Sequence, residues 1–166
     1  MRRTVERELA RARLRHHDGS IRPVPVSPLV DSIMRTLSRT PRGEPLVFEN
    51  SLDDDAAVAL HPDDLAELLG NLLENATRAA QGRVRVAASR NDGFLTVSID
   101  DDGKAADPEE MERLTGRGMR QDESGGAGLG LAIVGDILAA CGGHIGFARS
   151  SLGGLSVRLA LPGRSR

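Results

Sequence analysis

Two asparagines, Asn71 and Asn75, lie four residues apart in a segment with helical periodicity. Residues at this spacing lie one above the other along a helix. Two carboxamide oxygens on one ridge can coordinate a hard cation such as Mg²⁺, which takes its other ligands from water and phosphates. Arg78, one turn further on, can reach the same phosphates. The same pattern also fits a solvated polar helix face that binds nothing.

A run of three carboxylates, Asp100 to Asp102, ends an alternating apolar segment and is followed by Gly103. A buried aspartate at the end of a strand can accept a hydrogen bond from an exocyclic amine such as that of adenine. Three carboxylates also suggest Ca²⁺, but neither EF-hand spacing nor a closing glutamate follows. A plain acidic turn is the other interpretation.

Glycine is concentrated late in the chain, where twelve of the 19 glycines lie between Gly116 and Gly154. The run at 125–130 leads directly into an apolar helical segment, and backbone N–H groups at such a helix start can bind phosphate. No Gly-Lys-Ser/Thr follows, so this is not a Walker A loop, and the spacing of a dinucleotide fingerprint is also missing. Arg117 and Arg120 precede the run and suit phosphate recognition. The alternatives are a flexible linker and an exposed basic loop.

Composition limits the kinds of function. The 166 residues are 39% hydrophobic and 28% charged, which is typical of a folded domain. The single cysteine, Cys141, excludes a disulfide framework and a multi-cysteine metal site. A net charge of −2 with no Trp or Tyr argues against nucleic-acid binding, and no apolar run reaches the roughly 18 residues of a membrane helix. We expect neither a nucleic-acid partner nor a membrane-embedded segment.

Hydrophobic periodicity places these motifs on secondary structure. Helices are predicted over 1–17, 28–39, 62–80, around 107–115, and over 129–141. Strands are predicted over 46–51, 56–60, 83–89, 94–100, 144–150 and 155–161. Because the strands come mostly in adjacent pairs, the order favours an α+β sandwich in which a mixed, mostly antiparallel sheet carries helices on one face. The segment from about 102 to 128 has weak periodicity, which is typical of a functional lid or of a disordered segment, and we assign it as a lid.

The order of these motifs resembles that of a known family. Asn-Leu-Leu-Glu-Asn-Ala at 71–76, Asp-Asp-Gly at 101–103 and Gly-Ala-Gly-Leu-Gly-Leu-Ala-Ile-Val at 126–134 resemble the N box and the two glycine-rich boxes of sensor histidine kinases. Gly-Gly-Leu-Ser at 153–156 resembles the family's final glycine motif, and Arg-Gly-Met-Arg at 117–120 is similar to the PhoQ branch. The resemblance covers 24–162 and implies the GHKL, or Bergerat, α/β sandwich.

The resemblance also implies residue roles. Asn71 and Asn75 would hold Mg²⁺ and act in catalysis, with Arg78 on the phosphates. Asp101 would accept the adenine amine, with Gly103 beside the base. The residues implied to surround the phosphates of ATP are Arg117, Arg120, Gly126, Gly128, Leu129 and Gly130. Lys104 and Ala105 stand where the family usually has Pro and a second Gly.

The implied activity is transfer of the γ-phosphoryl group of ATP to a histidine on a separate dimerisation domain, followed by a response regulator. Residues 1–20 would end the dimerisation helix, 24–162 would form the ATP-binding domain and 163–166 a tail. The implied location is the cytoplasm, in a dimeric protein anchored in the bacterial inner membrane. Open alternatives are a degenerate nucleotide-binding switch, an anti-sigma-type serine kinase of the same fold, and a structural domain without nucleotide.

Overall fold

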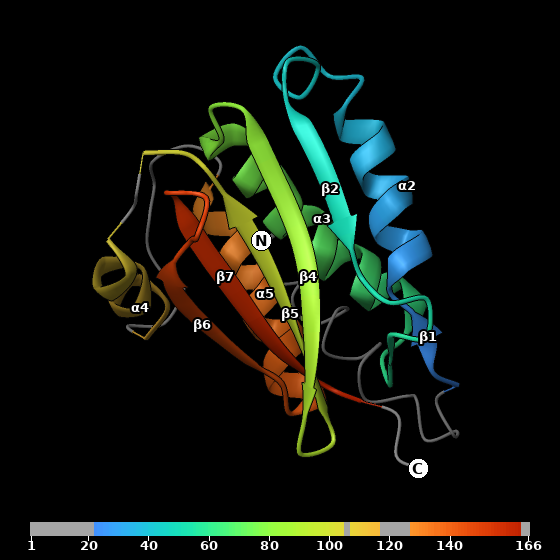
Figure 1. Ribbon diagram of the computed structural model, residues 1–166. Coiled ribbons are helices and arrows are strands. Elements are labelled where there is room, and N and C mark those ends of the chain that lie inside the picture. Colours follow the sequence, from blue (N-terminus) through green and yellow to red (C-terminus); the bar gives the residue numbers. More distant parts are fainter. Residues whose placement is uncertain (1–21, 105–106, 117–126, 164–166) are drawn as a thin grey trace, which may run out of the picture.

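The computed structural model describes residues 22–104, 107–116 and 127–163 (Figure 1). The predicted helix at 1–17, the tail at 164–166 and several predicted site residues lie outside these ranges. Those site residues are Arg117, Arg120 and Gly126; Ala105, which replaces the family's second glycine, also lies outside. Within the described part, the chain forms one five-stranded sheet, a two-stranded sheet and four helices.

The main sheet has the order β2-β4-β5-β7-β6. Its strands are β2 Val47–Ser51, β4 Arg83–Asn91, β5 Phe94–Asp101, β6 His144–Arg149 and β7 Leu155–Pro162. Every neighbouring pair is antiparallel except β2 and β4, which are parallel. Asp92 and Gly93 connect β4 to β5 with φ angles of 46° and 79°, as the two-residue hairpin turn requires. The predicted mixed, mostly antiparallel sheet is confirmed.

Not every two strands that follow one another in the sequence form a hairpin. The predicted strands at 46–51 and 56–60 flank an acidic turn, but they pair with different partners. β3 Ala57–Val58 pairs with β1 Val24–Pro25, whereas β2 lies beside β4. A parallel pair needs a long crossover connection, which α3 supplies between β2 and β4. The site helix α3 is therefore the main part of the connection between these two parallel strands.

Three helices form the second layer, two of them behind the sheet in Figure 1 and one at its edge beside β2. They are α2 Ser27–Leu37, α3 Pro62–Ala79 and α5 Ala127–Cys141. α4 Pro108–Gly116 lies beside β6 instead. α3 begins where the sequence predicts, with Pro62 at its start and two aspartates in its first turn, where the helix dipole favours negative charge.

The core lies between α3, α5 and the sheet. On α3, five leucines are at most 2% exposed: Leu65, Leu68, Leu69, Leu72 and Leu73. They meet buried residues of β4, β5 and β7, namely Val84, Val86, Leu95, Val97, Ile99, Leu159 and Leu161. Because the leucines turn one face of α3 toward the sheet, its asparagine ridge lies to the side of the core. Burial of this apolar surface supplies the main driving force that holds the ridge in place.

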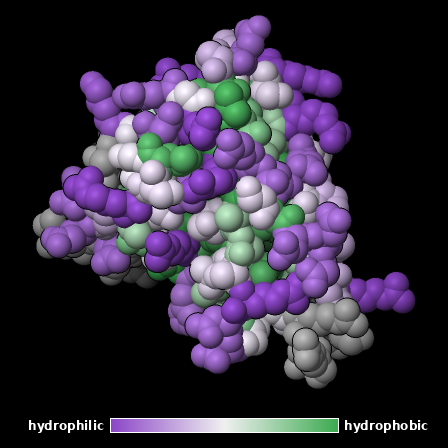
Figure 2. All heavy atoms as spheres, in the orientation of Figure 1, coloured by the Kyte–Doolittle hydropathy of each residue, from purple (hydrophilic) through white to green (hydrophobic). Residues whose placement is uncertain are grey.

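The other face of the sheet is open in the described part of the chain. It carries residues that alternate with the core positions of each strand, among them Arg83 and Arg85 on β4 and Arg158 on β7. Figure 2 views this face, where hydrophilic side chains predominate over small hydrophobic patches. The sandwich therefore has one layer of helices and one polar sheet surface.

Candidate functional site

Asn71 and Asn75 lie half-buried on one ridge of α3, as the sequence predicts. The carboxamide nitrogen of Asn71 donates to the backbone oxygen of Glu67 at 2.7 Å, which orients the amide along the helix. Its Oδ1 then faces α5, because a Cβ built on Gly130 would lie only 2.8 Å from that oxygen. Glycine at 130 thus allows α5 to approach the Asn71 amide closely.

The start of α5 lies beside this ridge. The sequence predicts a helix from 129, and the structure begins it two residues earlier at Ala127, so Gly128 and Leu129 belong to its first turn. The first N–H groups of a helix have no partner within the helix and carry partial positive charge. Since Gly130 abuts Asn71, these donors lie on the asparagine side of α3. The two motifs, more than fifty residues apart, form one polar site.

Asp101 ends β5 and is 4% exposed. Its Oδ1 accepts two backbone hydrogen bonds, from Gly103 at 2.8 Å and from Leu155 at 3.3 Å. Its backbone oxygen accepts a third, from Gly154 at 3.1 Å. Among the described residues, no hydrogen bond goes to Oδ2. The carboxylate is therefore held through Oδ1 alone, and the prediction that Asp101 accepts a donor from a ligand falls on Oδ2.

Burial raises the pKa of Asp101 above its usual value, although the N–H groups of Gly103 and Leu155 act to lower it. The neighbouring charges of Asp102 and Asp100 add to the rise. A carboxylate in such surroundings gains from a hydrogen-bond donor that replaces lost water. The electrostatics of Asp101 thus favour a ligand that brings a donor.

Two glycines allow the backbone to close around Asp101. A Cβ on Gly103 would overlap the backbone oxygen of Ala79, at the end of α3. A Cβ on Gly154 would overlap Oδ1 of Asp101 itself. Sequence reasoning assigned Gly103 to the site and gave Gly154 no role there. The signal for Gly154 was the glycine pair before the last strand, whose position opposite Asp101 only the sheet register reveals.

The three successive aspartates point to three different places, so they form no shared Ca²⁺ site. Asp100 lies on the open face of the sheet beside Arg85, and Asp101 faces inward. Asp102 accepts backbone hydrogen bonds from Gln81 at 2.9 Å and Gly82 at 3.0 Å, just after α3. No cluster of His, Cys, Asp and Glu suited to a metal ion occurs among the described residues.

Asp102 links the end of β5 to the turn after α3, a role that sequence reasoning missed. Burial acts to raise its pKa, but the backbone N–H groups of Gly82, Arg83 and Gln81 outweigh it and hold the pKa below its usual value. The charged carboxylate of Asp102 therefore connects the end of β5 to the end of α3, and both elements carry predicted site residues.

Arg78 lies on the exposed end of α3. Its guanidinium is 3.4 Å from Oε1 of Glu74, one turn back, and its backbone oxygen accepts a 2.6 Å hydrogen bond from Arg42. A pair this exposed contributes little to stability and is easily exchanged for another anion. The position is compatible with the predicted phosphate contact, which stays a prediction.

A hollow of about 620 Å³ lies between the α2–β2 loop and the end of α3. Its lining residues are Pro41, Arg42, Pro45, Leu46, Ala79, Ala80, Gln81 and Lys104. Asn71, Asn75 and Asp101 do not line it. The candidate site is therefore defined by the convergence of α3, α5 and the β5 end, and not by this hollow.

Comparison with known proteins assigns this arrangement to a family. The model of the histidine kinase-, DNA gyrase B-, and HSP90-like ATPases matches residues 60–165, well over half of the chain. The chain belongs to this family. The resemblance to sensor histidine kinases seen in the sequence motifs is confirmed, as is the α+β sandwich.

Individual proteins that resemble this chain are also sensor histidine kinases. The two-component sensor PhoQ of Pseudomonas aeruginosa is 34% identical over 153 residues, which are 92% of this chain and 34% of PhoQ. The mycobacterial sensor histidine kinase MprB superposes with a TM-score of 0.73 at 26% identity, covering 87% of this chain and 99% of the MprB chain. Full-length ShkA in complex with AMPPNP gives a TM-score of 0.69 at 26% identity, covering 98% of this chain and 35% of ShkA.

The chain spans only 23% to 34% of the length of the curated sensor kinases it matches first. The assignment of individual residues to metal, base and phosphates stays a prediction. In the described part of the chain, no helix combines the length and hydropathy needed to cross a bilayer.

Proposed function

We propose that this chain is the ATP-binding catalytic domain of a sensor histidine kinase. The observation that carries the proposal is the convergence of three separate motifs: the Asn71 ridge of α3, the start of α5, and the backbone-clamped carboxylate of Asp101. Family membership and the likeness to ShkA in complex with AMPPNP support ATP as the nucleotide.

Asp101 would recognise the base. Adenine offers its exocyclic amine as a donor, whereas guanine offers an acceptor oxygen at the equivalent position. A carboxylate whose Oδ1 is held by Gly103 and Leu155 can accept the adenine amine at Oδ2 and repels guanine. The absence of side chains at Gly103 and Gly154 leaves the backbone close to Asp101 and keeps its orientation fixed.

Asn71 and Asn75 would hold Mg²⁺ together with the phosphates. Their donor set fits this ion, because neutral carboxamide oxygens on one ridge leave coordination positions open for phosphate and water. Bound Mg²⁺ neutralises phosphate charge during transfer. The N–H groups at the start of α5, with Gly128, Leu129 and Gly130 in its first turns, would bind phosphate oxygens, and Arg78 would add a positive charge. We extend the same role to Arg117, Arg120 and Gly126.

This domain would position the nucleotide, and the acceptor would come from another domain. Phosphoryl transfer depends mainly on in-line positioning and charge stabilisation. We propose a histidine on a dimerisation domain of the full-length dimer as the acceptor, and a response regulator as the next partner. Residues 1–20 would end the dimerisation helix, 24–162 would form the catalytic domain, 102–128 its lid and 163–166 a tail. The domain would work in the cytoplasm, in a protein anchored in the inner membrane.

The first experiment is a titration with ATP and GTP, each with and without Mg²⁺. We expect binding of ATP that requires Mg²⁺ and exceeds binding of GTP. A chain that binds neither nucleotide would contradict the proposal and favour a structural domain. The second experiment adds the dimerisation domain of the native protein and follows phosphate transfer from labelled ATP. We expect acid-labile phosphohistidine. Binding without transfer would favour the nucleotide-binding switch, an alternative that Ala105 also favours because it replaces the family's second glycine after Asp-Asp-Gly at 101–103.

A further inference from the structure

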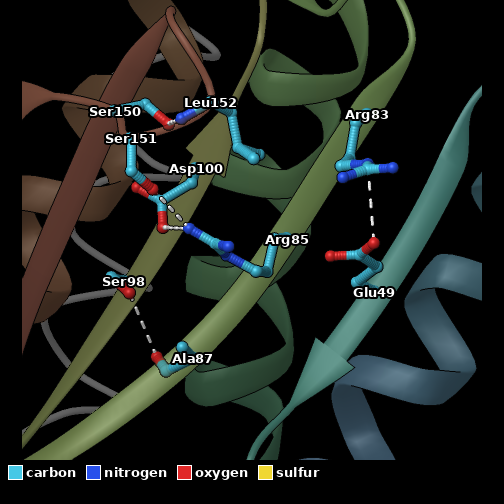
Figure 3. Close-up of polar contacts among 9 residues, drawn as sticks. All are labelled: Glu49, Arg83, Arg85, Ala87, Ser98, Asp100, Ser150, Ser151 and Leu152. Carbon is cyan, nitrogen blue, oxygen red and sulfur yellow. Dashed lines mark hydrogen bonds and ion pairs between the residues drawn. The ribbon is translucent and has the colours of Figure 1, made fainter.

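Arg85 lies on the open face of the sheet, behind the strand end that carries Asp101. It faces Asp100 across the β4–β5 pair, and its Nη2 lies 3.7 Å from Oδ2 of that carboxylate. The same nitrogen donates a 2.7 Å hydrogen bond to Oγ of Ser151 in the β6–β7 turn (Figure 3). One guanidinium thus connects β4, the end of β5 and a turn more than sixty residues later in the chain.

The β6–β7 turn is itself closed by hydrogen bonds around Ser150. Ser150 is 8% exposed, and its Oγ accepts the N–H of Leu152 at 3.0 Å. Its backbone N–H donates to Gly154 and its backbone oxygen accepts from Gly153. Gly153 has a φ of 109°, which glycine adopts readily. The turn is therefore compact, and a contact that fixes Ser151 also fixes the position of the whole turn.

The far side of this turn holds Asp101. The N–H groups of Gly154 and Leu155 donate to the backbone oxygen and to Oδ1 of Asp101, and a Cβ at Gly154 would overlap that Oδ1. A displacement of the turn must therefore move the carboxylate. In addition, Arg85 provides a positive charge beside Asp100, whose negative charge acts on Asp101.

We propose that Arg85 is a positioning residue for base recognition, which anchors the β6–β7 turn through Ser151 and Asp100 and so fixes the carboxylate of Asp101. This inference rests on the proposed role of Asp101 in reading the base. Arg85 itself lies on the opposite face of the sheet and has no contact with the nucleotide. Its effect is on the preference for ATP over GTP, because that preference depends on where the Asp101 oxygen lies.

The test compares Arg85→Gln with Arg83→Gln. Arg83 is a matched control: it lies two residues earlier on β4, on the same face, and its Nε is 3.5 Å from Oε1 of Glu49 on β2, away from the turn (Figure 3). Both variants remove one positive charge and one cross-strand ion pair. Calorimetry with Mg-ATP and Mg-GTP measures the affinity ratio, and thermal unfolding checks that each variant folds.

We expect Arg85→Gln to reduce the ATP-over-GTP ratio about tenfold, within the range of coupling in one hydrogen-bonded network, while Arg83→Gln leaves the ratio unchanged. Ser151→Ala removes one exposed hydroxyl, and we expect it to lower the ratio about threefold and to add nothing in the double variant with Arg85→Gln. A ratio in Arg85→Gln equal to that in Arg83→Gln overturns the proposal, as does equal weakening of ATP and GTP.

If Arg85→Gln does not fold, Ser151→Ala decides the question, and an unchanged ratio in that variant overturns the proposal. Failure of the proposed function gives a different result. In that case the unmodified chain itself shows no binding of Mg-ATP or no preference over Mg-GTP, and both proposals fall.

Discussion

Asp101 and Asp102 are neighbours in the chain with opposite electrostatic roles. Burial raises the pKa of Asp101, whereas backbone donors outweigh burial at Asp102 and lower its pKa. The surroundings of Asp101 therefore destabilise its charged form, at the position where we propose that the base binds. The surroundings of Asp102 stabilise its charged form, which links the end of β5 to the turn after α3. Residue type alone does not distinguish them, because the direction of each side chain decides its surroundings.

Substitution of each aspartate by asparagine should show this contrast as a function of pH. The pKa of Asp101 is higher in the folded chain than in the unfolded chain, where it is near 3.8. Asp101 therefore contributes to the free energy of unfolding below pH 3.8, and this contribution is lost as the pH rises through the folded-state pKa. Asp101→Asn should therefore gain free energy of unfolding relative to the parent between pH 4 and pH 7. The contribution of Asp102 is present above 3.8 and is lost as pH falls through its lower folded value, so Asp102→Asn should lose relative stability at pH 7.

Urea unfolding of the parent and both variants at pH 4 and pH 7 measures these differences. If both variants changed in the same direction with pH, the assigned causes of the pKa shifts would be wrong. The same Asp101→Asn protein should bind Mg-ATP more weakly than the parent, because an amide presents a donor as well as an acceptor to the adenine amine.

Asn75 and Leu72 offer a second contrast at this scale, three residues apart on α3. Leu72 is 2% exposed in the core, whereas Asn75 is half-buried on the polar ridge. Leu72→Ala should lower the free energy of unfolding by about 2–5 kcal/mol. Asn75→Ala should change it by no more than about 0.5 kcal/mol and should abolish Mg²⁺-dependent nucleotide binding. Chemical denaturation and calorimetry on both variants check this, and Mg-ATP binding by Asn75→Ala would exclude the metal role.

At the scale of elements, the contact between α3 and α5 determines how the asparagine ridge meets the start of α5, where we propose that phosphate binds. Gly130 allows this contact, because a Cβ there would lie 2.8 Å from Oδ1 of Asn71. The amide of Asn71 can move away from an added methyl group, but only by leaving its present orientation. Helix packing and the proposed metal coordination by Asn71 would therefore depend on the same small residue.

Gly130→Ala should accordingly separate stability from binding. Alanine favours the helix over glycine by up to about 1 kcal/mol, so the melting temperature should stay constant or rise. Affinity for Mg-ATP should fall about tenfold because the Asn71 amide is displaced. Gly70→Ala is the matched control, since a Cβ at that position of α3 meets nothing within 4 Å. It should gain stability and keep its affinity; an equal loss in both variants would contradict the Asn71 contact.

The elements were largely predictable from the sequence. Alternation placed β4, β5, β6 and β7 within two residues at each end, because each strand has one buried face and one open face. The leucine stripe identified the buried side of α3, and the three site motifs were recognised. The parallel pairing of β2 with β4 was not predicted, since local periodicity carries no information on which strands become neighbours. For the same reason, the contacts of Gly154 and Leu155 with Asp101 could only come from the sheet register.

At the scale of the whole molecule, the site belongs to no single element. It needs α3, the start of α5, the end of β5 and the β6–β7 turn, all held by one core. A ligand that binds only when these parts are together should stabilise the entire fold, because binding to the native state shifts the unfolding equilibrium by mass action.

Thermal unfolding tests this linkage. At a concentration of Mg-ATP one hundred times its Kd, the gain is about 2.7 kcal/mol, which corresponds to an increase in Tm of about 5–10 °C for a domain of this size. Removal of Mg²⁺ with EDTA should cancel most of the increase. GTP at the same concentration should give a smaller one. Stabilisation by ATP that EDTA does not change would count against coordination by Asn71 and Asn75.

The bond between Leu155 and Asp101 joins residues 54 positions apart, and β7 lies between β5 and β6 in the sheet. During synthesis, a chain that has left the ribosome only as far as β6 therefore lacks both an interior strand and the backbone donors that hold the Asp101 carboxylate. Long-range contacts of this kind form late in folding. Discrimination between purines, the role proposed for Asp101, would consequently begin only once β7 has joined the sheet, and a nascent chain that binds ATP through Asp101 would already have closed its sheet.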